Sequence, residues 1–145
     1  MRLFLDANIL FLAGYSPTSP VHDLLALQTA GACILTTSAY ALEEARRNLQ
    51  LKGPEGWSAS FDIARPRIAV VGEAEAAARE AAAQAGVADP ADVPILAAAI
   101  QARVDGLVTG DRRAFGALFG RTVHGVTILT LRDALTRVLA EGARP

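Results

Sequence analysis

Two aspartates stand where buried strands are expected to end, and carboxylates at such positions can hold a metal ion. Asp6 closes the short run 2–5, and Asp111 directly follows the run 106–110. In an open α/β sheet, ligands bind in the crevice outside the carboxyl ends of the strands. Carboxylates gathered there repel one another unless a cation lies between them, and hard divalent ions such as Mg²⁺ take oxygen ligands. The pattern therefore predicts a metal-dependent enzyme that acts on phosphate esters.

Five short apolar runs could form the sheet that positions these acids, and they alternate with helical patterns. The predicted strands comprise residues 3–5, 33–36, 68–71, 106–109 and 126–129. The predicted helices comprise residues 7–14, 21–30, 39–51, 57–63, 73–85, 89–104, 112–119 and the segment after the capping residue Thr130. Strands that alternate with helices are typical of a mostly parallel sheet sandwiched between helices. We therefore expect a single α/β domain over residues 1–145.

Composition limits the classes of function. Apolar residues make up 52% of the 145 residues and the formal net charge is −1, so a nucleic-acid ligand would need local basic patches and a metal. The single Cys33 excludes an intrachain disulfide framework and is expected in the core. No uninterrupted apolar run approaches the ~20 residues that span a bilayer, and the N-terminal stretch does not resemble a signal peptide. We expect a cytoplasmic protein with no membrane partner.

Two adjacent glutamates in the third predicted helix are distinguished by helix geometry. Leu42, Ala45 and Leu49 define the apolar stripe of that helix. At ~100° per residue, Glu43 falls nearly opposite the stripe, whereas Glu44 falls at its edge. We therefore expect Glu43 in solvent and Glu44 leaning over the end of the sheet as an active-site carboxylate.

Helix capping is the structural alternative for the other acids. Asp89 or Asp92 can cap the helix that follows, and Asp92 in that role would put Pro94 harmlessly in the first turn. The apolar run after Asp92 must be buried, which fixes Asp92 at the inner edge of the domain and leaves Asp89 at the rim. Asp6 and Asp111 can likewise cap the helices that follow them.

Four segments, taken in order, resemble the motifs of the PIN-domain family, and small bacterial VapC-like toxin ribonucleases in particular. They are residues 4–10, 38–49, 92–99 and 108–115, and residues 125–129 resemble the usual close of the domain. The resemblance covers nearly the whole chain and is least in the segment 53–67. It implies a three-layer α/β/α fold with about five strands, and an Mg²⁺- or Mn²⁺-dependent endoribonuclease acting on single-stranded RNA.

The resemblance assigns the catalytic, metal-binding pocket to four carboxylates: Asp6, Glu44, Asp92 and Asp111. Our hypothesis is that Asp6 and Asp111 hold the principal ion, while Asp92 and Glu44 complete its shell or orient its waters.

Other polar and aromatic residues are candidates for supporting roles. Asn8 and Thr109 would support the metal ligands. The candidates for contact with RNA are Arg46, Arg47, Arg112 and Arg113, with Tyr15 and Trp57 as stacking groups, and ordinary surface charge or core packing is the alternative for each.

Partners and competing functions follow from the same resemblance. Many small members of the family are toxins that a small antitoxin protein silences, and homodimers are common among them. One competing function is a phosphatase with Asp6 as nucleophile, but such sites want a second aspartate where this chain has Asn8. The other is a catalytically silent PIN-like module that binds protein or RNA. Metal-dependent RNA cleavage would distinguish the ribonuclease from both.

Overall fold

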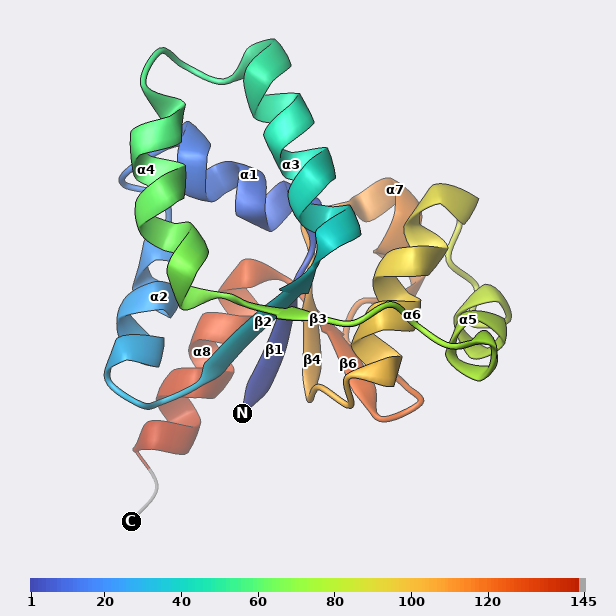
Figure 1. Ribbon diagram of the computed structural model, residues 1–145. Coiled ribbons are helices and arrows are strands. Elements are labelled where there is room, and N and C mark those ends of the chain that lie inside the picture. The colour runs from blue at the N-terminus through green and yellow to red at the C-terminus, as the bar shows by residue number, and fades with distance from the viewer. Residues whose placement is uncertain (144–145) are drawn as a thin grey trace.

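A six-stranded sheet forms the centre of the molecule, with the strand order β3-β2-β1-β4-β6-β5 (Figure 1). The computed structural model describes residues 1–143, so residues 144 and 145 of the predicted domain lie outside it. The strands are β1 (Arg2–Leu5), β2 (Ile34–Ser38), β3 (Ala69–Val71), β4 (Gly106–Val108), β5 (Thr122–Val123) and β6 (Val126–Leu129). Every neighbouring pair is parallel except β5 with β6. The predicted α/β class with a mostly parallel sheet is confirmed.

Helices cover both faces of this sheet. The α-helices are α1 (Ala7–Tyr15), α2 (Val21–Thr29), α3 (Ala39–Lys52), α4 (Trp57–Ala64), α5 (Ala76–Ala83), α6 (Val93–Gln101), α7 (Arg112–Phe115) and α8 (Leu131–Gly142). The short 3-10 helices are η1 (Arg65–Arg67), η2 (Pro90–Asp92) and η3 (Gly116–Leu118). Helices α2 and α8 pack together on one face, and α6, backed by α5, lies on the other (Figure 1). These are the three layers that the family resemblance implied.

The central strands are shielded from water on both faces. Leu3, Phe4 and Leu5 of β1 are fully buried, as are Leu107 and Val108 of β4. Parallel strands that are covered on both faces have continuous apolar runs instead of alternating apolar and polar residues. These continuous runs are the signal that allowed the strands to be predicted from the sequence, although each is short. Among residues 1–143, no helix has the length and apolar character needed to cross a membrane.

Several local features differ from the sequence-based prediction. The segments predicted as single helices over 89–104 and 112–119 each contain a 3-10 helix and a shorter α-helix, η2 with α6 and α7 with η3. The short antiparallel strand β5 was not predicted, and a two-residue connection with positive φ at both His124 (47°) and Gly125 (83°) joins it to β6. Such a connection suits a tight hairpin, although histidine is a less obvious signal for it than asparagine or aspartate. Helix α5 begins at Ala76 instead of Glu73, because Glu75 has an extended backbone and stands at the N-cap.

The strand order of the sheet reverses at β1, because β2 and β3 lie on one side of it and β4 and β6 on the other. This reversal determines where a ligand can bind. Strand β1 lies between β2 and β4, and its register pairs Leu5 with Val108. The backbone N–H of Asp6 donates to the Val108 carbonyl at 3.0 Å, which extends the pairing by one residue. Asp6 and Thr109, each the first residue beyond its strand, are thereby neighbours at the carboxyl end of the sheet. Ligands of open α/β sheets bind at this kind of switch point.

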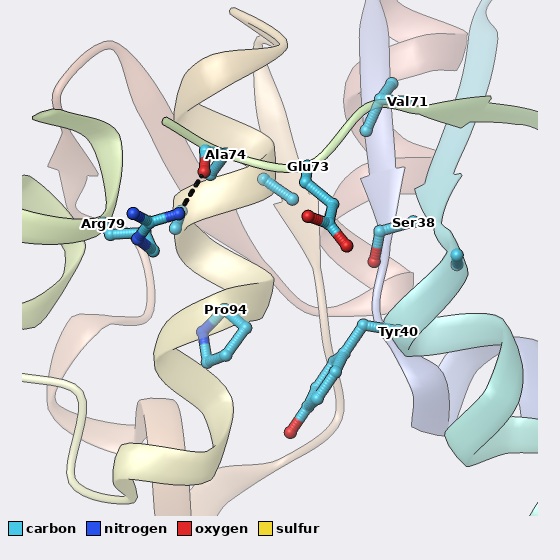
Figure 2. A pocket seen from close by; sticks show the side chains of 10 residues that line it. Ser38, Tyr40, Val71, Glu73, Ala74, Arg79 and Pro94 are labelled. Carbon is cyan, nitrogen blue, oxygen red and sulfur yellow. Dashed lines mark hydrogen bonds between the residues drawn. The ribbon is translucent and has the colours of Figure 1, made fainter. Parts of the chain in front are cut away.

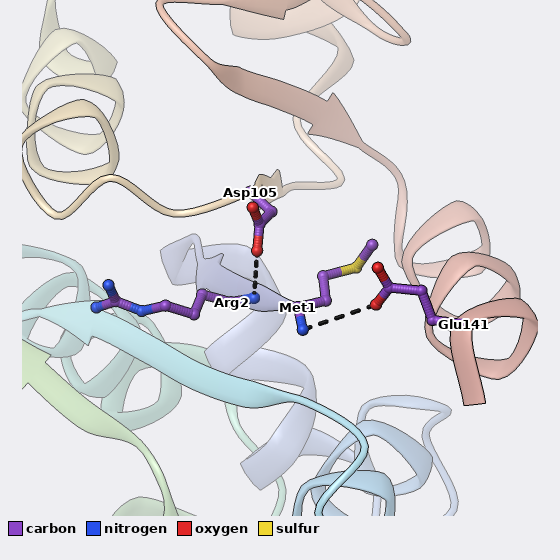
Figure 3. Close-up of polar contacts among 4 residues, drawn as sticks. All are labelled: Met1, Arg2, Asp105 and Glu141. Atoms are coloured by element: carbon purple, nitrogen blue, oxygen red, sulfur yellow. Dashed lines mark hydrogen bonds and ion pairs between the residues drawn. The ribbon is translucent and has the colours of Figure 1, made fainter. Parts of the chain in front are cut away.

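Hydrogen bonds and an ion pair hold the amino end of β1 to neighbouring elements (Figure 3). The backbone N–H of Arg2 donates to Oδ2 of Asp105 at 2.7 Å, and the Asp105 N–H donates to the Arg2 carbonyl at 2.8 Å. The amino group of Met1 lies 3.6 Å from the carboxylate of Glu141 in α8. Asp105 therefore faces a hydrogen-bond donor and Glu141 faces a positive charge.

Candidate metal centre

Carboxylates from three separate elements meet at the carboxyl end of the sheet. Asp6 follows β1, Glu44 belongs to α3, and Asp92 ends η2 just before α6. One carboxylate oxygen from each residue lies within 4.8 Å of the other two. Asp6 and Asp92 are buried and Glu44 is half-buried. Together with Asp111 they line a cavity of about 180 Å³, which we call the acidic cavity.

Asp6 is held rigidly by hydrogen bonds to both of its side-chain oxygens. Its Oδ1 accepts the backbone N–H of Ala7 at 2.6 Å, which also caps α1. Its Oδ2 accepts the Thr109 hydroxyl at 2.8 Å and the Asn8 amide at 3.0 Å. The Asn8 Oδ1 in turn accepts the Gly110 N–H at 2.7 Å. Asn8 and Thr109 therefore fix the orientation of Asp6 and tie the end of β1 to the end of β4.

Neighbouring acids that look alike in the sequence have different surroundings. Glu43 is exposed, while Glu44 lies on the side of α3 that faces the acidic cavity. Asp89 is exposed and caps η2, since its Oδ1 accepts the Ala91 N–H at 3.0 Å. Asp92 stands at the N-cap position of α6 but makes no side-chain capping bond. Asp89 therefore has a structural role as a helix cap, whereas the Asp92 carboxylate makes no capping bond and lines the acidic cavity.

Burial and like charge raise the pKa of all three clustered carboxyl groups. For Asp92, burial has the largest effect, the charges of Asp6 and Asp111 add to it, and the pKa rises from 3.8 to about 7. Burial also raises the pKa of Glu44, and the charge of Asp6 is the next cause. For Asp6, burial outweighs the hydrogen bonds from Thr109 and its neighbours, which lower the pKa. A cation among these oxygens would relieve the repulsion.

Asp111 lies beside the cluster but outside the group of three. Its Oδ1 caps α7 by accepting the N–H groups of Arg113 and Ala114, each at 3.0 Å. It still lines the acidic cavity, and its negative charge contributes to the raised pKa values of Asp6, Glu44 and Asp92. The structure thus brings oxygens of three of the four predicted acids within 4.8 Å of one another and places Asp111 at the edge.

Three further residues of the acidic cavity with polar or aromatic side chains were not singled out from the sequence: Phe11, Asn48 and Lys52. The ammonium of Lys52 lies over the Phe11 ring, 5.5 Å from its centroid. Asn48 and Lys52 follow Glu44 at intervals of four residues, so they share its face of α3. The four-residue spacing from Glu44 could have predicted both residues from the sequence. It places the Lys52 ammonium and the Asn48 amide beside the carboxylates of the acidic cavity.

The arginine and aromatic candidates lie outside the acidic cavity. Arg46 and Arg47 line a separate surface hollow with Arg65, and the Arg46 guanidinium lies 5.4 Å from the centroid of the Phe61 ring. Arg112 and Arg113 are exposed in α7. Tyr15 and Trp57 line a hollow between α1 and α4, where Tyr15 stacks on Phe11 and Trp57 packs edge-on against Phe61.

Comparison with known proteins identifies the family. Residues 2–113 match the family model described as PIN domain, whereas no curated protein matches the sequence. A chain of VapBC2 from Rickettsia felis, solved bound to a DNA fragment from their promoter, has a TM-score of 0.65 and 19% identity over 90% of this chain and 98% of that chain. A chain of FitAB bound to IR36 DNA has a TM-score of 0.52 and 18% identity, over 89% and 94%. Since the family match spans most of its sequence, this chain belongs to the PIN domain family.

Proposed function

We propose that this chain is a divalent-metal-dependent endoribonuclease that hydrolyses phosphodiester bonds of single-stranded RNA. The observation that carries the proposal is the approach of oxygens from Asp6, Glu44 and Asp92 to within 4.8 Å of one another. Mg²⁺ binds oxygen ligands at about 2.0–2.1 Å, so two oxygens that share one ion lie no more than about 4 Å apart. Small side-chain rotations would bring the oxygens of all three residues into that range. The donor set therefore fits Mg²⁺ or Mn²⁺.

The residues of the acidic cavity divide the work between them. Asp6, Glu44 and Asp92 would hold the ion, and Asp111, partly committed to capping α7, would act from the edge through a water. In this proposal Asp92 and Glu44 join Asp6 as direct ligands, in place of the hypothesis from the sequence that Asp6 and Asp111 hold the principal ion. When bound, the ion lowers the pKa of an attacking water, shields the phosphate charge and stabilises the leaving oxygen. Lys52 would contact a phosphate oxygen of the same RNA strand.

Asn8 and Thr109 would act on the reaction through Asp6. Both donate to its Oδ2, so they keep the remaining lone pairs of the carboxylate directed toward the cavity. The exposed arginines outside the cavity remain proposals for RNA contact: Arg46, Arg47, Arg112 and Arg113.

The proposal includes a partner protein. The solved complexes VapBC2 and FitAB are each bound to a DNA fragment, and we infer that this chain is the toxin of a toxin–antitoxin pair. Its formal net charge of −1 gives it no broad basic surface for DNA, so a small partner would supply the DNA contact. The same partner would silence cleavage. A symmetric homodimer is the assembly we propose for the chain itself.

The experiment is cleavage of a mixed single-stranded RNA pool with Mg²⁺, with Mn²⁺ and with EDTA, comparing wild type with Asp92→Asn. Asp92 makes no capping bond, so the amide should leave the fold intact while removing a charged ligand. We expect metal-dependent cleavage to fall by more than about 100-fold, since losing even an outer-shell partner typically costs 10–100-fold. Asp89→Asn is the matched control, because Asp89 is exposed and an asparagine oxygen can accept the same capping bond.

Asp6→Asn is a less clean variant. Both oxygens of Asp6 accept hydrogen bonds from N–H or O–H donors, so an amide nitrogen would face a donor and the fold would lose stability. If folded wild type binds metal but cuts no RNA under any condition, the ribonuclease proposal fails and the silent binding module replaces it. Equal cleavage by wild type and Asp92→Asn would overturn the assigned ligand set.

A further inference from the structure

A second cavity, of about 230 Å³, lies between the start of α3 and α6 (Figure 2). We call it the Tyr40 cavity. Its walls come from the end of β2, the segment after β3, α5 and the first turns of α6, and the residues used below are Ser38, Tyr40, Glu73, Pro94, Ala97 and Ala98. Arg79 of α5 also lines the cavity, where its guanidinium donates to the Ala74 carbonyl at 2.7 Å and makes no ion pair with Glu73. Figure 2 shows the Tyr40 ring and the Glu73 carboxylate directed into this space from opposite ends.

The Tyr40 cavity adjoins the acidic cavity through shared elements. Tyr40 precedes Glu44 by one helical turn on α3, so both side chains project from the same face of the helix. The Tyr40 hydroxyl donates to the Ala91 carbonyl at 2.7 Å, which fixes the ring beside the residue that precedes Asp92. Burial, followed by the charges of Glu44 and Asp92, raises the pKa of Tyr40. A group bound against the Tyr40 ring would therefore lie next to the clustered carboxylates.

The walls of the Tyr40 cavity suit a flat ring with hydrogen-bond donors on its edge. Tyr40 is 45% exposed and offers a ring face, while Pro94, Ala97 and Ala98 give a low apolar floor. Within residues 1–143, no cation lies within ion-pair distance of Glu73. An ionised carboxylate only accepts hydrogen bonds, so Glu73 repels phosphate and favours N–H groups.

We propose that the Tyr40 cavity binds one base of the RNA substrate, that this base is guanine, and that it sets the cleavage sequence. The inference rests on the proposed ribonuclease function. The volume is below the roughly 300–1,000 Å³ of sites for drug-sized ligands, so it suits a single base and not a whole nucleotide. Bases of single-stranded RNA are read by stacking on aromatic side chains and by hydrogen bonds to their Watson–Crick edges.

Guanine fits this cavity better than the other three bases. Its Watson–Crick edge presents two adjacent N–H donors, at N1 and N2, which match the two oxygens of the Glu73 carboxylate. Adenine and cytosine place an acceptor nitrogen beside their amino group, and uracil flanks its single N–H with two carbonyls. The Ser38 oxygen accepts the Ala41 N–H at 3.2 Å, which leaves the hydroxyl hydrogen for the guanine O6.

The first arm of the test uses the four nucleosides, which have no phosphate and so do not depend on metal. Guanosine, adenosine, cytidine and uridine are titrated into the full chain and followed by amide NMR shifts. We expect guanosine alone to shift the signals of residues around the Tyr40 cavity, and Glu73→Gln to weaken it about tenfold through loss of the paired charge-assisted bonds. Glu80→Gln, an exposed glutamate of α5 outside the cavity, is the matched control.

The second arm maps cleavage sites in a random single-stranded RNA pool. Wild type and Glu80→Gln should cut at a fixed position relative to guanine, and Glu73→Gln should lose that preference. Cleavage by wild type with the same base preference in Glu73→Gln overturns the base cavity while the ribonuclease stands. No cleavage by wild type defeats the proposed function instead. Guanosine shifts that map elsewhere, or equal binding of all four nucleosides, likewise overturn the inference.

Discussion

The two ends of β1 place acidic side chains in opposite surroundings. At the amino end, Asp105 accepts a backbone N–H and Glu141 lies beside an amino group (Figure 3). At the carboxyl end, the oxygens of Asp6, Glu44 and Asp92 lie within 4.8 Å of one another and burial raises their pKa values. The same residue types therefore stabilise the fold at one end of the strand and destabilise it at the other.

This difference separates structural carboxylates from functional ones without reference to any activity. A structural carboxylate has a donor that favours its ionised form, and its removal leaves that donor unpaired. A functional carboxylate in a cluster is costly for the protein alone and becomes favourable when a ligand of opposite charge binds. Proteins commonly accept such a loss of stability at an active site. The contrast predicts opposite responses to substitution at the two ends.

The largest expected effect contrasts two adjacent residues of α3. Glu44 faces the acidic cavity and Glu43 is exposed, so Glu44→Gln should reduce metal-dependent RNA cleavage by more than about 100-fold, whereas Glu43→Gln should leave it unchanged. Initial rates on one single-stranded RNA at saturating Mn²⁺ measure both. If Glu43→Gln is the inactive variant, the assignment of the two glutamates from helix geometry is reversed and Glu44 is not a ligand.

The next effect is the pH dependence of stability in EDTA. Asp92 has a pKa of 3.8 when unfolded and about 7 when folded, so between these values the folded state binds more protons than the unfolded state. The contribution of Asp92 to the free energy of unfolding then falls as pH rises. The stability associated with protonated Asp92 is fully present below pH 3.8 and is lost as pH passes about 7.

Divalent metal should oppose this loss. Urea unfolding across this pH range should show Mg²⁺ or Mn²⁺ restoring stability at the alkaline end, beyond an ionic-strength control, by binding the folded state. Asp92→Asn in EDTA should flatten the profile, because the titrating carboxyl group is gone. A wild-type profile that rises with pH in EDTA would show that the three carboxylates are not clustered in solution.

The fold could be predicted largely from the sequence because its signals are local. Continuous apolar runs mark the buried parallel strands, and side-chain caps such as Ser38 and Thr130 mark the starts of α3 and α8. The hairpin of β5 and β6 was missed because its turn depends on a histidine with positive φ, which local propensity does not favour. Within the site, the side of α3 occupied by Glu44 followed from the spacing of apolar residues around it.

The remaining features of the site depend on tertiary contacts that spacing does not encode. Asp111 and Asp92 both look like helix caps in the sequence, and only the structure shows that Asp111 caps α7 while the Asp92 side chain caps nothing. Lys52 enters the acidic cavity because α3 extends across α1, three turns beyond Tyr40. The Tyr40 cavity is built from separate segments of the sequence that lie between Ser38 and Ala98, so no local pattern predicts it.

The smallest expected effect tests the amino end of β1. Asp105→Ala removes the acceptor of the Arg2 N–H, and we expect it to lower the free energy of unfolding by about 1 kcal/mol, the usual net value of one hydrogen bond. The loss should be the same with and without Mn²⁺, because Asp105 lies at the opposite end of the strand from the acidic cavity.

Glu141→Gln should cost less than about 0.5 kcal/mol, since the carboxylate of its ion pair is 45% exposed. Urea unfolding in EDTA measures both against Asp92→Asn, which should gain stability above its pKa. If Asp105→Ala also stabilised the metal-free protein, the two ends of β1 would not differ in the way described.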